Sequence, residues 1–319
     1  MQVTKGAEKT SEGRLRRIGK SLMKYRHLHL MALPGLIFFL IFKYVPMYGL
    51  VIAFKHYVGA AGGFQAIMAS RWVGLRNFQM FFQSIYFTRL LSNTLIISLY
   101  RILFFFPAPI LLALLMNEIQ RTWFKRTVQT VTYMPYFLSW VVVAGLMSIL
   151  LSPDNGPINA LRQLMGMQPV YFLAQKKYFR TLLVLSEIWK NVGYGSIVYL
   201  AAITSVDPAL YEAARMDGAG KIQQIVHVTL PAISEIIAIM LILTVGRVLD
   251  DNFDQIFNLY SPATYEVADV FETYIYRTGI TEGKFSYTAA VGLFKSAISL
   301  LLILVTNRVS KRLGSDGII

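Results

Sequence analysis

The stretch VDPALYEAARMDGAGKIQQIVHVTLPA, residues 206–232, stands between two apolar segments of the chain and is more polar than either of them. Asp207 is a favourable N-cap because its side chain can accept hydrogen bonds from the free N–H groups of a first helical turn. Pro208 suits the first helical position, where its missing N–H costs nothing. Strong helix formers follow over residues 209–216. We therefore predict that the stretch begins with a short helix.

A glycine turn should separate this helix from a second one. Gly218 and Gly220 can adopt positive φ at little steric cost. Residues 221–228 again favour a helix. We expect that second helix to end before Leu230-Pro231, because a proline interrupts the helical hydrogen-bond ladder.

The exposed end of this predicted helix pair combines small and charged residues. Ala213 and Ala214 permit a close approach of another backbone, and Glu212 carries a carboxylate that a partner's arginine could bind. These are the properties of a docking surface. An amphipathic helix that only lies on a membrane would show a similar pattern, so the residues by themselves leave both interpretations open.

The rest of the chain has the composition of a membrane protein. Of its 319 residues, 55% are hydrophobic and only 15% are charged, and the mean hydropathy is +0.51. A soluble domain carries about 25% charged residues, so the composition excludes an ordinary water-soluble enzyme. The chain has no cysteine, which excludes disulfides and thiolate metal sites. Its four histidines show no zinc-binding pattern, and we expect no metal site.

Six apolar segments are each near the ~20 residues that a helix needs to cross ~30 Å of hydrocarbon. They cover residues 29–54, 88–116, 128–151, 180–205, 233–250 and 288–307. We therefore predict an all-α polytopic membrane protein with six transmembrane helices. Its transmembrane domain would span residues 29–307, between a basic N-terminal tail of residues 1–28 and a C-terminal tail of residues 308–319.

The distribution of Lys and Arg predicts the orientation of these helices. Six spans put both termini on one side, where 16 Lys and Arg residues lie, against 8 on the other side. This bias places both termini and the 206–232 loop in the cytoplasm. Three long connections, residues 55–87, 152–179 and 251–287, then lie outside. The net charge of +14 is explained by this bias, so we expect no nucleic-acid partner.

The 206–232 loop resembles the EAA motif of permease subunits in binding-protein-dependent ABC importers. The motif consists of E-A-A, two residues, D-G-A, five residues, F, two residues, I, one residue and L-P. The chain matches it with Glu212, Ala213, Ala214, Asp217, Gly218, Ala219, Leu230 and Pro231, and has Ile225 and Val228 in place of phenylalanine and isoleucine. The segments WVGLRNFQMFF, SPDNGPIN and EIWKNVGYGSIVYLAAI are also similar to the carbohydrate-importing branch, most of all to polysaccharide and oligosaccharide permeases such as those for alginate.

This resemblance implies a type I importer fold and a multi-pass subunit of the bacterial cytoplasmic membrane. The implied partners are membrane lipid, a second permease subunit, two ATPase subunits, an extracytoplasmic solute-binding protein and a carbohydrate. The eight motif residues would form the coupling helix that contacts an ATPase subunit. ATP and magnesium would be bound by the ATPase subunits, and this chain would hold no cofactor and be no enzyme. Its Gly220-Lys221 pair lacks the first glycine and the final Ser/Thr of a phosphate loop.

The implied substrate is an oligo- or polysaccharide, and we favour an anionic one resembling alginate. The loops of residues 55–87 and 152–179 contain six basic residues and one acidic residue, Asp154. The third outer loop, residues 251–287, has six carboxylates and so does not add to this argument.

Charged side chains inside the predicted spans are candidates for the substrate pathway, because each costs roughly 2.5–3.5 kcal/mol at mid-bilayer. Aromatic and amide side chains of the fourth span could bind a sugar. The candidates are Arg101, Glu187, Trp189, Lys190, Asn191, Tyr194, Tyr199, Arg247 and Asp250.

Structural roles are an open alternative for every one of these candidates. Glu187 and Lys190 are spaced for a local ion pair, as are Arg247 and Asp250. Arg101 could pair with a carboxylate of a neighbouring helix. The aromatic residues could serve only as packing or interface anchors.

Two other classes of function remain open at this stage. An ion-coupled secondary transporter would use the intramembrane charges as a relay and need no ATPase. A membrane-embedded transferase acting on lipid-linked sugars would place a carboxylate cluster such as Asp250, Asp251 and Asp254 at the surface.

Overall fold

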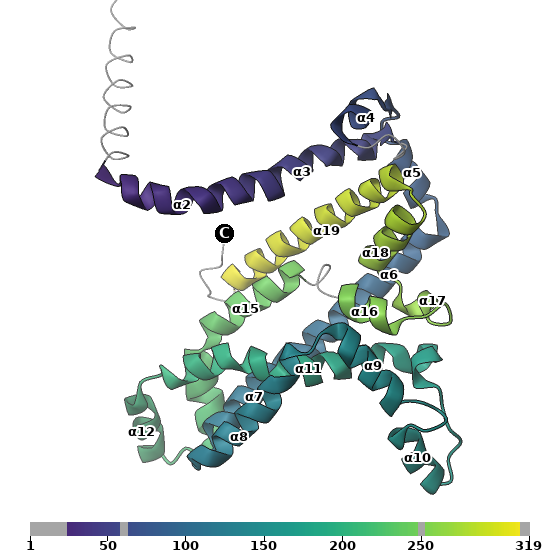
Figure 1. Cartoon of the computed structure of the whole chain (residues 1–319). Coiled ribbons are helices and arrows are strands. Elements are labelled where there is room, and N and C mark those ends of the chain that lie inside the picture. The colour runs from purple at the N-terminus through teal and green to yellow at the C-terminus, as the bar shows by residue number, and fades with distance from the viewer. Residues whose placement is uncertain (1–23, 58–62, 248–252, 313–319) are drawn as a thin grey trace, which may run out of the picture. The chain divides into compact units, whose positions relative to one another are not determined.

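A computed structural model describes residues 24–57, 63–247 and 253–312. The chain divides into two compact units, Met1–Ile52 and Ala53–Ile319. The described part is almost entirely helical, as predicted (Figure 1). Its two strands are short: β1 (Lys55–His56) pairs antiparallel with β2 (Arg71–Trp72).

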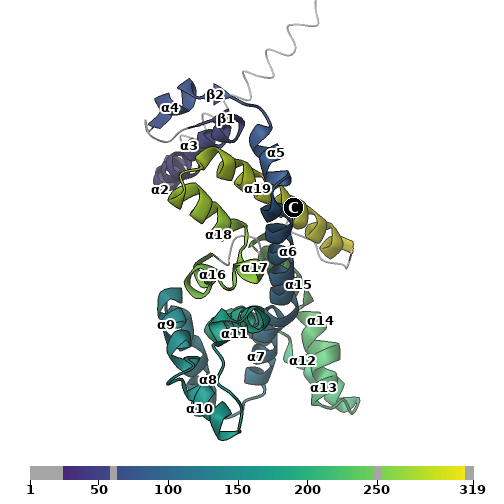
Figure 2. The ribbon, with the colours of Figure 1, turned by 90° about the vertical axis from the view of Figure 1, so that its right-hand side faces the viewer.

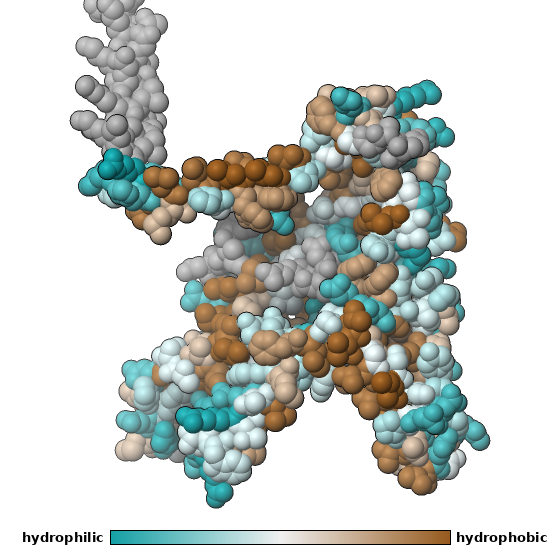
Figure 3. Space-filling view, in the orientation of Figure 1, coloured by the Kyte–Doolittle hydropathy of each residue, from teal (hydrophilic) through white to brown (hydrophobic). Residues whose placement is uncertain are grey.

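The first helical run starts with α2 (Arg26–Phe39) and continues through the π-helical turn η1 (Leu40–Tyr44). It goes on through α3 (Val45–Met47) and the 3-10 helix η2 (Tyr48–Phe54). The run is 29 residues long and apolar enough to cross a membrane. Hydrophobic side chains cover most of it in Figure 3.

Within the described residues of the second unit, two more helical runs are long and apolar enough to span a membrane, residues 85–117 and 285–308. The first combines α6 (Ile85–Tyr100), the π-helical turn η4 (Arg101–Phe105) and α7 (Pro107–Asn117). The second is α19 (Phe285–Arg312). The π-helical turn η4 lies directly before the prolines at 107 and 109, so the helix continues where an interior proline alone would disrupt an α-helical ladder.

The third predicted span is a bent pair of helices. α8 (Thr122–Tyr133) and η5 (Met134–Phe137) meet α9 (Trp140–Leu150) at an angle of 104°. The expectation of one uninterrupted helix over residues 128–151 was therefore wrong. The physical reason is local: Ser139 has extended backbone, and its Oγ accepts a hydrogen bond from the Val142 N–H at 3.3 Å, which starts a new helix.

The fifth predicted span is also bent. α13 (Lys221–Gln224), the π-helical turn η7 (Ile225–Thr229) and α14 (Leu230–Ala232) form one helical run. It meets α15 (Ser234–Arg247) at 65°. The second loop helix was expected to end before Leu230-Pro231, and this was wrong. The Leu230 N–H donates to the Ile225 carbonyl five residues back, and this wider turn lets Pro231 take an early position in the next helical segment, where proline is tolerated.

The fourth predicted span is the 29-residue helix α11 (Lys176–Thr204), which packs mainly against α7 and α8. Gly193 allows the contact with α8, since a Cβ atom there would lie 2.1 Å from the Thr132 carbonyl oxygen. One buried cluster lies between α7, α11 and the α14–α15 junction: Ile110, Ala113, Leu114, Met116, Tyr199, Leu200, Ile203 and Ile233. Partly buried Ile236, Ile237 and Met240 of α15 pack against it.

The remaining short helices belong to the connections between spans. They are α4 (Gly63–Ala69), α5 (Arg76–Phe82), α10 (Pro157–Leu164), η6 (Phe172–Ala174), α12 (Pro208–Met216), α16 (Phe253–Leu259), α17 (Tyr265–Ala268), α18 (Phe271–Ile275) and η8 (Tyr276–Thr281). In Figure 1, α5, α10 and α17 lie toward the right-hand side of the second unit and α12 lies at its left-hand end. Figure 2 views the unit from the side of α5, α10 and α17. One described helix from each long connection thus lies on the side away from α12 of the 206–232 loop. Which of these sides faces the cytoplasm stays a prediction.

Candidate functional site

The first helix of the 206–232 loop has well-formed caps at both ends. The Asp207 Oδ1 accepts a hydrogen bond from the Ala209 N–H at 2.9 Å. At the other end, the Ala219 N–H donates to the Ala214 carbonyl at 2.9 Å, and the Gly218 N–H donates to the Arg215 carbonyl at 3.0 Å. These two bonds form a Schellman motif, and Gly218 has the φ of +79° that the motif requires. The predicted helix, glycine turn and second helix are confirmed.

Side-chain hydrogen bonds hold the turn and the second helix in place. The Gly220 N–H donates to the Gln223 Oε1 at 2.7 Å, and the buried Gln224 donates from Nε2 to the Ala219 carbonyl at 2.8 Å. The hydroxyls of Tyr211 and Thr229 lie 3.0 Å apart, which ties α12 to η7. These bonds hold the glycine turn between the two helices and join α12 to η7.

The end of the unit that carries this helix pair is mostly hydrophilic in Figure 3, yet two of the pair's large apolar side chains are exposed. Met216 is 88% exposed and Ile222 is 77% exposed. The motif residues Glu212, Ala213 and Asp217 are exposed as well. Such a combination on a protein surface is typical of an interaction site.

A shallow groove of about 320 Å³ runs beside this turn. Its lining consists of Ala214, Asp217, Gly218, Ala219, Gln223, His227 and Val228. Three of the motif's small residues thus form a concave surface that a partner's side chain could enter.

The helix pair is anchored to the transmembrane helices rather than hanging free. Leu230 packs against the buried cluster of α7, α11 and α15. The Lys221 Nζ lies 2.7 Å from the Glu118 Oε2, just after the end of α7. A displacement of α12 and α13 would therefore reach α7 and α11 directly.

The buried charges on the spans form a specific ion pair. Arg101 of η4 and Glu187 of α11 are 6% and 3% exposed. The Arg101 Nε donates to both carboxylate oxygens at 2.8 and 2.9 Å, and its Nη2 donates to Oε1 at 2.5 Å. The structure thus shows the expected carboxylate from a neighbouring helix beside Arg101.

Lys190 instead belongs to an aromatic cluster on α11 and the α8–α9 bend. Its Nζ donates to the Tyr136 carbonyl at 2.8 Å and lies 5.1 Å from the Tyr136 ring centre and 5.6 Å from the Trp140 ring centre. The rings of Tyr136 and Tyr194 stack at 3.8 Å. Of the candidates on α11, this structure brings Lys190 and Tyr194 together, and Tyr136 and Trp140 are partners that sequence reasoning missed.

The other candidates are separated from this cluster or from each other. Trp189 is exposed and lines an apolar pocket of about 340 Å³ between α9 and α11. Asn191 is half-buried, and Tyr199 is buried in the core. Arg247 is the last residue of α15, while Asp250 and Asp251 lie outside the described residues.

A polar network on the side of the long connections was not predicted. Buried Asp269 pairs with Arg277 at 2.5 Å. The Asn93 Nδ2 donates to the carbonyls of Glu266 and Asp269, both at 3.0 Å. Lys176 at the start of α11 forms an ion pair with Glu266. Its hydrogen bond and positive charge hold the pKa of the Glu266 carboxyl below its usual value. The many carboxylates of residues 251–287 were the sequence signal for this network.

Metal binding finds no support among the residues that the structure describes. No group of three or more His, Asp or Glu side chains is arranged there to hold a metal ion.

Comparisons with known proteins agree with this architecture. The family model of binding-protein-dependent transport system inner membrane components matches residues 105–315. The polygalacturonan/rhamnogalacturonan transport system permease protein YteP of Bacillus subtilis is 47% identical over 93% of this chain and 91% of its own length.

Two solved structures are similar over the whole described fold. One is a bacterial ABC transporter involved in the import of the acidic polysaccharide alginate, with 42% identity and a TM-score of 0.87 over 94% of this chain and all of the matched one. The other is a bacterial alginate ABC transporter in complex with an alginate pentasaccharide-bound periplasmic protein, with the same identity and TM-score over 95% of this chain. The predicted all-α type I importer fold is confirmed.

Proposed function

Because the chain belongs to the family of binding-protein-dependent transport system inner membrane components, we propose that it is the transmembrane permease subunit of an ATP-driven importer for acidic oligo- or polysaccharides. The single observation that carries this proposal is the exposed, braced α12–α13 helix pair with its EAA sequence. A subunit of this kind conducts the solute and leaves ATP hydrolysis to other chains.

The substrate class is supported by the similar proteins. YteP is named for polygalacturonan and rhamnogalacturonan, and the similar structures import alginate, an acidic polysaccharide. Each of these proteins is named for a carbohydrate polymer, and polygalacturonan and alginate are polymers of acidic sugars. We propose an acidic saccharide for this chain as well, with the Lys190–Tyr136–Trp140–Tyr194 cluster as its contact within the spans.

The partners follow from the same proposal. A second permease subunit would pack beside the spans, and two ATPase subunits would bind from the cytoplasm. A solute-binding protein would dock on the side of α5, α10 and α17. Such a partner is supported by the similar alginate transporter that was solved in complex with a periplasmic protein. The chain would span the bacterial cytoplasmic membrane several times, with both termini in the cytoplasm. ATP and magnesium would be held by the ATPase subunits and no cofactor by this chain.

The mechanism would be mechanical. ATP binding closes the ATPase dimer, and the motion enters this chain through Glu212 and the exposed face of α12. It continues through Leu230 and the Lys221–Glu118 pair to α7 and α11. Movement of these helices would then open the solute pathway through the membrane toward the outer side and close it toward the cytoplasm. The solute-binding protein would deliver the saccharide on the outer side.

The test uses the assembled transporter in lipid nanodiscs, with ATPase activity measured in the presence of the loaded solute-binding protein. Glu212→Lys reverses a charge on the exposed face of α12, and Gly218→Pro is incompatible with the φ of +79° at that position. Both variants should insert normally and lose the stimulation of ATPase activity. The matched control Arg308→Glu reverses an exposed charge near the end of α19, outside the 206–232 loop, and should keep it. Normal stimulation in Glu212→Lys and Gly218→Pro would contradict the coupling role.

A further inference from the structure

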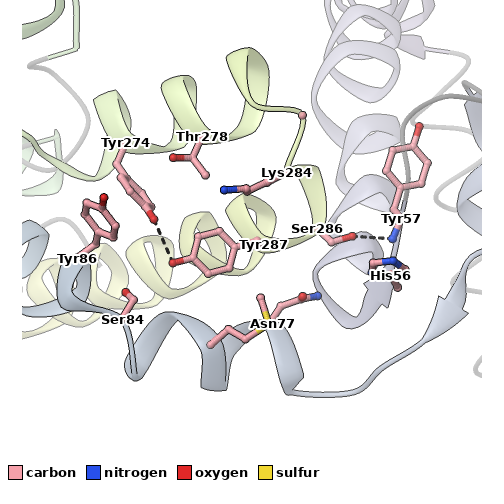
Figure 4. Close-up of a pocket in the computed structure, with 12 residues that line it drawn as sticks. His56, Tyr57, Asn77, Ser84, Tyr86, Tyr274, Thr278, Lys284, Ser286 and Tyr287 are labelled. Atoms are coloured by element: carbon pink, nitrogen blue, oxygen red, sulfur yellow. Dashed lines mark hydrogen bonds between the residues drawn. The ribbon is translucent and has the colours of Figure 1, made fainter.

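A second cavity lies outside the transmembrane charges and the α12–α13 helix pair. It has a volume of about 450 Å³, within the range of about 300–1,000 Å³ that is usual for small-molecule sites. Its walls come from β1, α5, the α5–α6 turn, α18, η8 and the start of α19 (Figure 4). This places it on the side of the long connections, opposite α12 (Figure 1).

Aromatic residues that carry hydroxyl groups dominate one wall of this cavity. The rings of Tyr86 and Tyr274 lie 5.0 Å apart, and the hydroxyls of Tyr274 and Tyr287 are 3.2 Å apart. Each phenolic oxygen can donate one hydrogen bond and accept others, so this pair keeps capacity for a ligand. Ser84 and Thr278 add two aliphatic hydroxyls to the lining. Ring faces with several hydroxyls nearby suit a sugar, which has apolar C–H faces and polar edges.

The lining carries one ammonium group, that of Lys284. Lys284 points toward Thr278 and Tyr287 in Figure 4. It also pairs with the exposed Glu282 at 2.8 Å. Among the described residues that line the cavity, none is a carboxylate, and His56 is the other ionisable base. An ammonium group in an aromatic, partly enclosed site favours a ligand that carries a carboxylate.

A firm framework supports the cavity. The Tyr57 N–H donates to the Ser286 Oγ at 2.8 Å, which ties the end of β1 to the start of α19. The Asn77 side chain donates to the carbonyls of Ala53 and Lys55 at 2.8 and 3.2 Å. Beneath the tyrosines, Phe81 and Phe271 pack in a buried aromatic cluster. The cavity is therefore shaped before any ligand arrives.

From this geometry we propose that the cavity binds one or two units of an acidic saccharide at the outer face. A sugar ring packs against the tyrosines, its hydroxyls bond to Tyr287 and Tyr274, and its carboxylate pairs with Lys284. The inference rests on the proposed function for the class of substrate, and it adds an outer subsite that meets the saccharide before the spans do.

The absence of cysteine from the chain makes a site-resolved test possible. In the assembled transporter, Ser84→Cys places one thiol of this chain in the cavity. Ser70→Cys is the matched control, because Ser70 is half-buried like Ser84 but does not line the cavity. Each serine hydroxyl donates to a backbone carbonyl: Ser84 to Phe81 at 2.8 Å and Ser70 to Ala66 at 2.6 Å. The rate of maleimide labelling of this chain is measured with tri-galacturonate as the probe.

Tri-galacturonate at ten times its Kd should slow labelling of Ser84→Cys about tenfold, as expected for a thiol accessible only in the free site, and leave Ser70→Cys unchanged. Adding Lys284→Gln to Ser84→Cys should weaken the affinity for the probe about tenfold, since one charge-assisted contact is lost. The same probe concentration should then slow labelling only about twofold. Neutral galactotriose should protect much less than tri-galacturonate.

Unchanged labelling of Ser84→Cys up to about 10 mM probe, which would fill most of even a millimolar site, would overturn the proposal. Equal protection by galactotriose, or protection by the empty solute-binding protein alone, would overturn it too. Saccharide-stimulated ATPase activity of the same sample is measured in parallel. Normal stimulation without protection rejects this subsite alone, whereas loss of all saccharide stimulation in the unmodified transporter rejects the proposed function.

Discussion

Removing the carboxylate of Glu187 should destabilise the protein strongly. The Glu187→Gln variant leaves the Arg101 guanidinium 6% exposed, without its counter-charge. Its Nη1 is already buried with no hydrogen-bond acceptor among the described residues. Breaking a buried pair by removing one partner typically costs 3–5 kcal/mol, because an uncompensated charge stays buried. The three hydrogen bonds of 2.5–2.9 Å place this pair at the upper part of that range.

Equilibrium unfolding of the purified chain with increasing SDS in detergent micelles measures this loss. Replacing both residues, Arg101→Met with Glu187→Met, should restore most of the stability, since two apolar side chains of similar length remove both buried charges. Glu266→Gln is the control, because the Lys176–Glu266 pair is largely exposed and its loss should cost only a small fraction of what Glu187→Gln costs. Wild-type stability of Glu187→Gln, or a double variant as unstable as the single one, would refute the reasoning.

Three further predictions concern packing, the turn and pH. Gly193→Ala should destabilise the chain by several kcal/mol in the same SDS assay, since its Cβ would lie 2.1 Å from a carbonyl oxygen; Gly145→Ala, with open space around it, is the control that should change little. Gly218→Ala should cost about 1–2 kcal/mol at the turn, because it forces an alanine to positive φ, and should speed amide hydrogen exchange of residues 217–224 about tenfold; unchanged exchange would contradict the need for glycine there. The pKa of Glu266 is lowered in the folded protein, so its ion pair with Lys176 stabilises the fold fully at neutral pH, and this stabilisation is lost as the pH falls through the lowered pKa. Glu266→Gln should lack this acid-dependent loss of stability in SDS unfolding. A variant with the same pH profile as the wild type would contradict a stabilising role for this pair.

The sequence predictions that the structure confirms rest on short-range sequence features. The Asp207 cap, the Gly218 turn and the long apolar segments each act within a few residues, so the helices and the loop helix pair could be predicted from them. The expected grouping of the long connections on one side followed from the alternating direction of successive predicted spans, and the distribution of basic residues predicted which side that is.

Predictions that depended on a partner far along the chain were less complete. The sequence indicated that Arg101 could pair with a carboxylate of a neighbouring helix but not which one, and the structure places it beside Glu187, 86 residues away. The cavity around Tyr287 is built from segments more than 200 residues apart, and no periodicity marks it. The bends at Ser139 and near Pro231 depend on π-helical and 3-10 turns that residue propensities do not distinguish from α-helix.

Cross-linking from the tip of the 206–232 loop is the most direct test of the central claim. Met216→Cys places one reactive thiol of this chain on the exposed end of α12. In a purified, transport-active complex, a short bifunctional reagent should join this residue to the ATPase subunit, and the loaded solute-binding protein and ATP should change the yield. A cross-link from residue 216 to the solute-binding protein, or none to any subunit while transport continues, would contradict it.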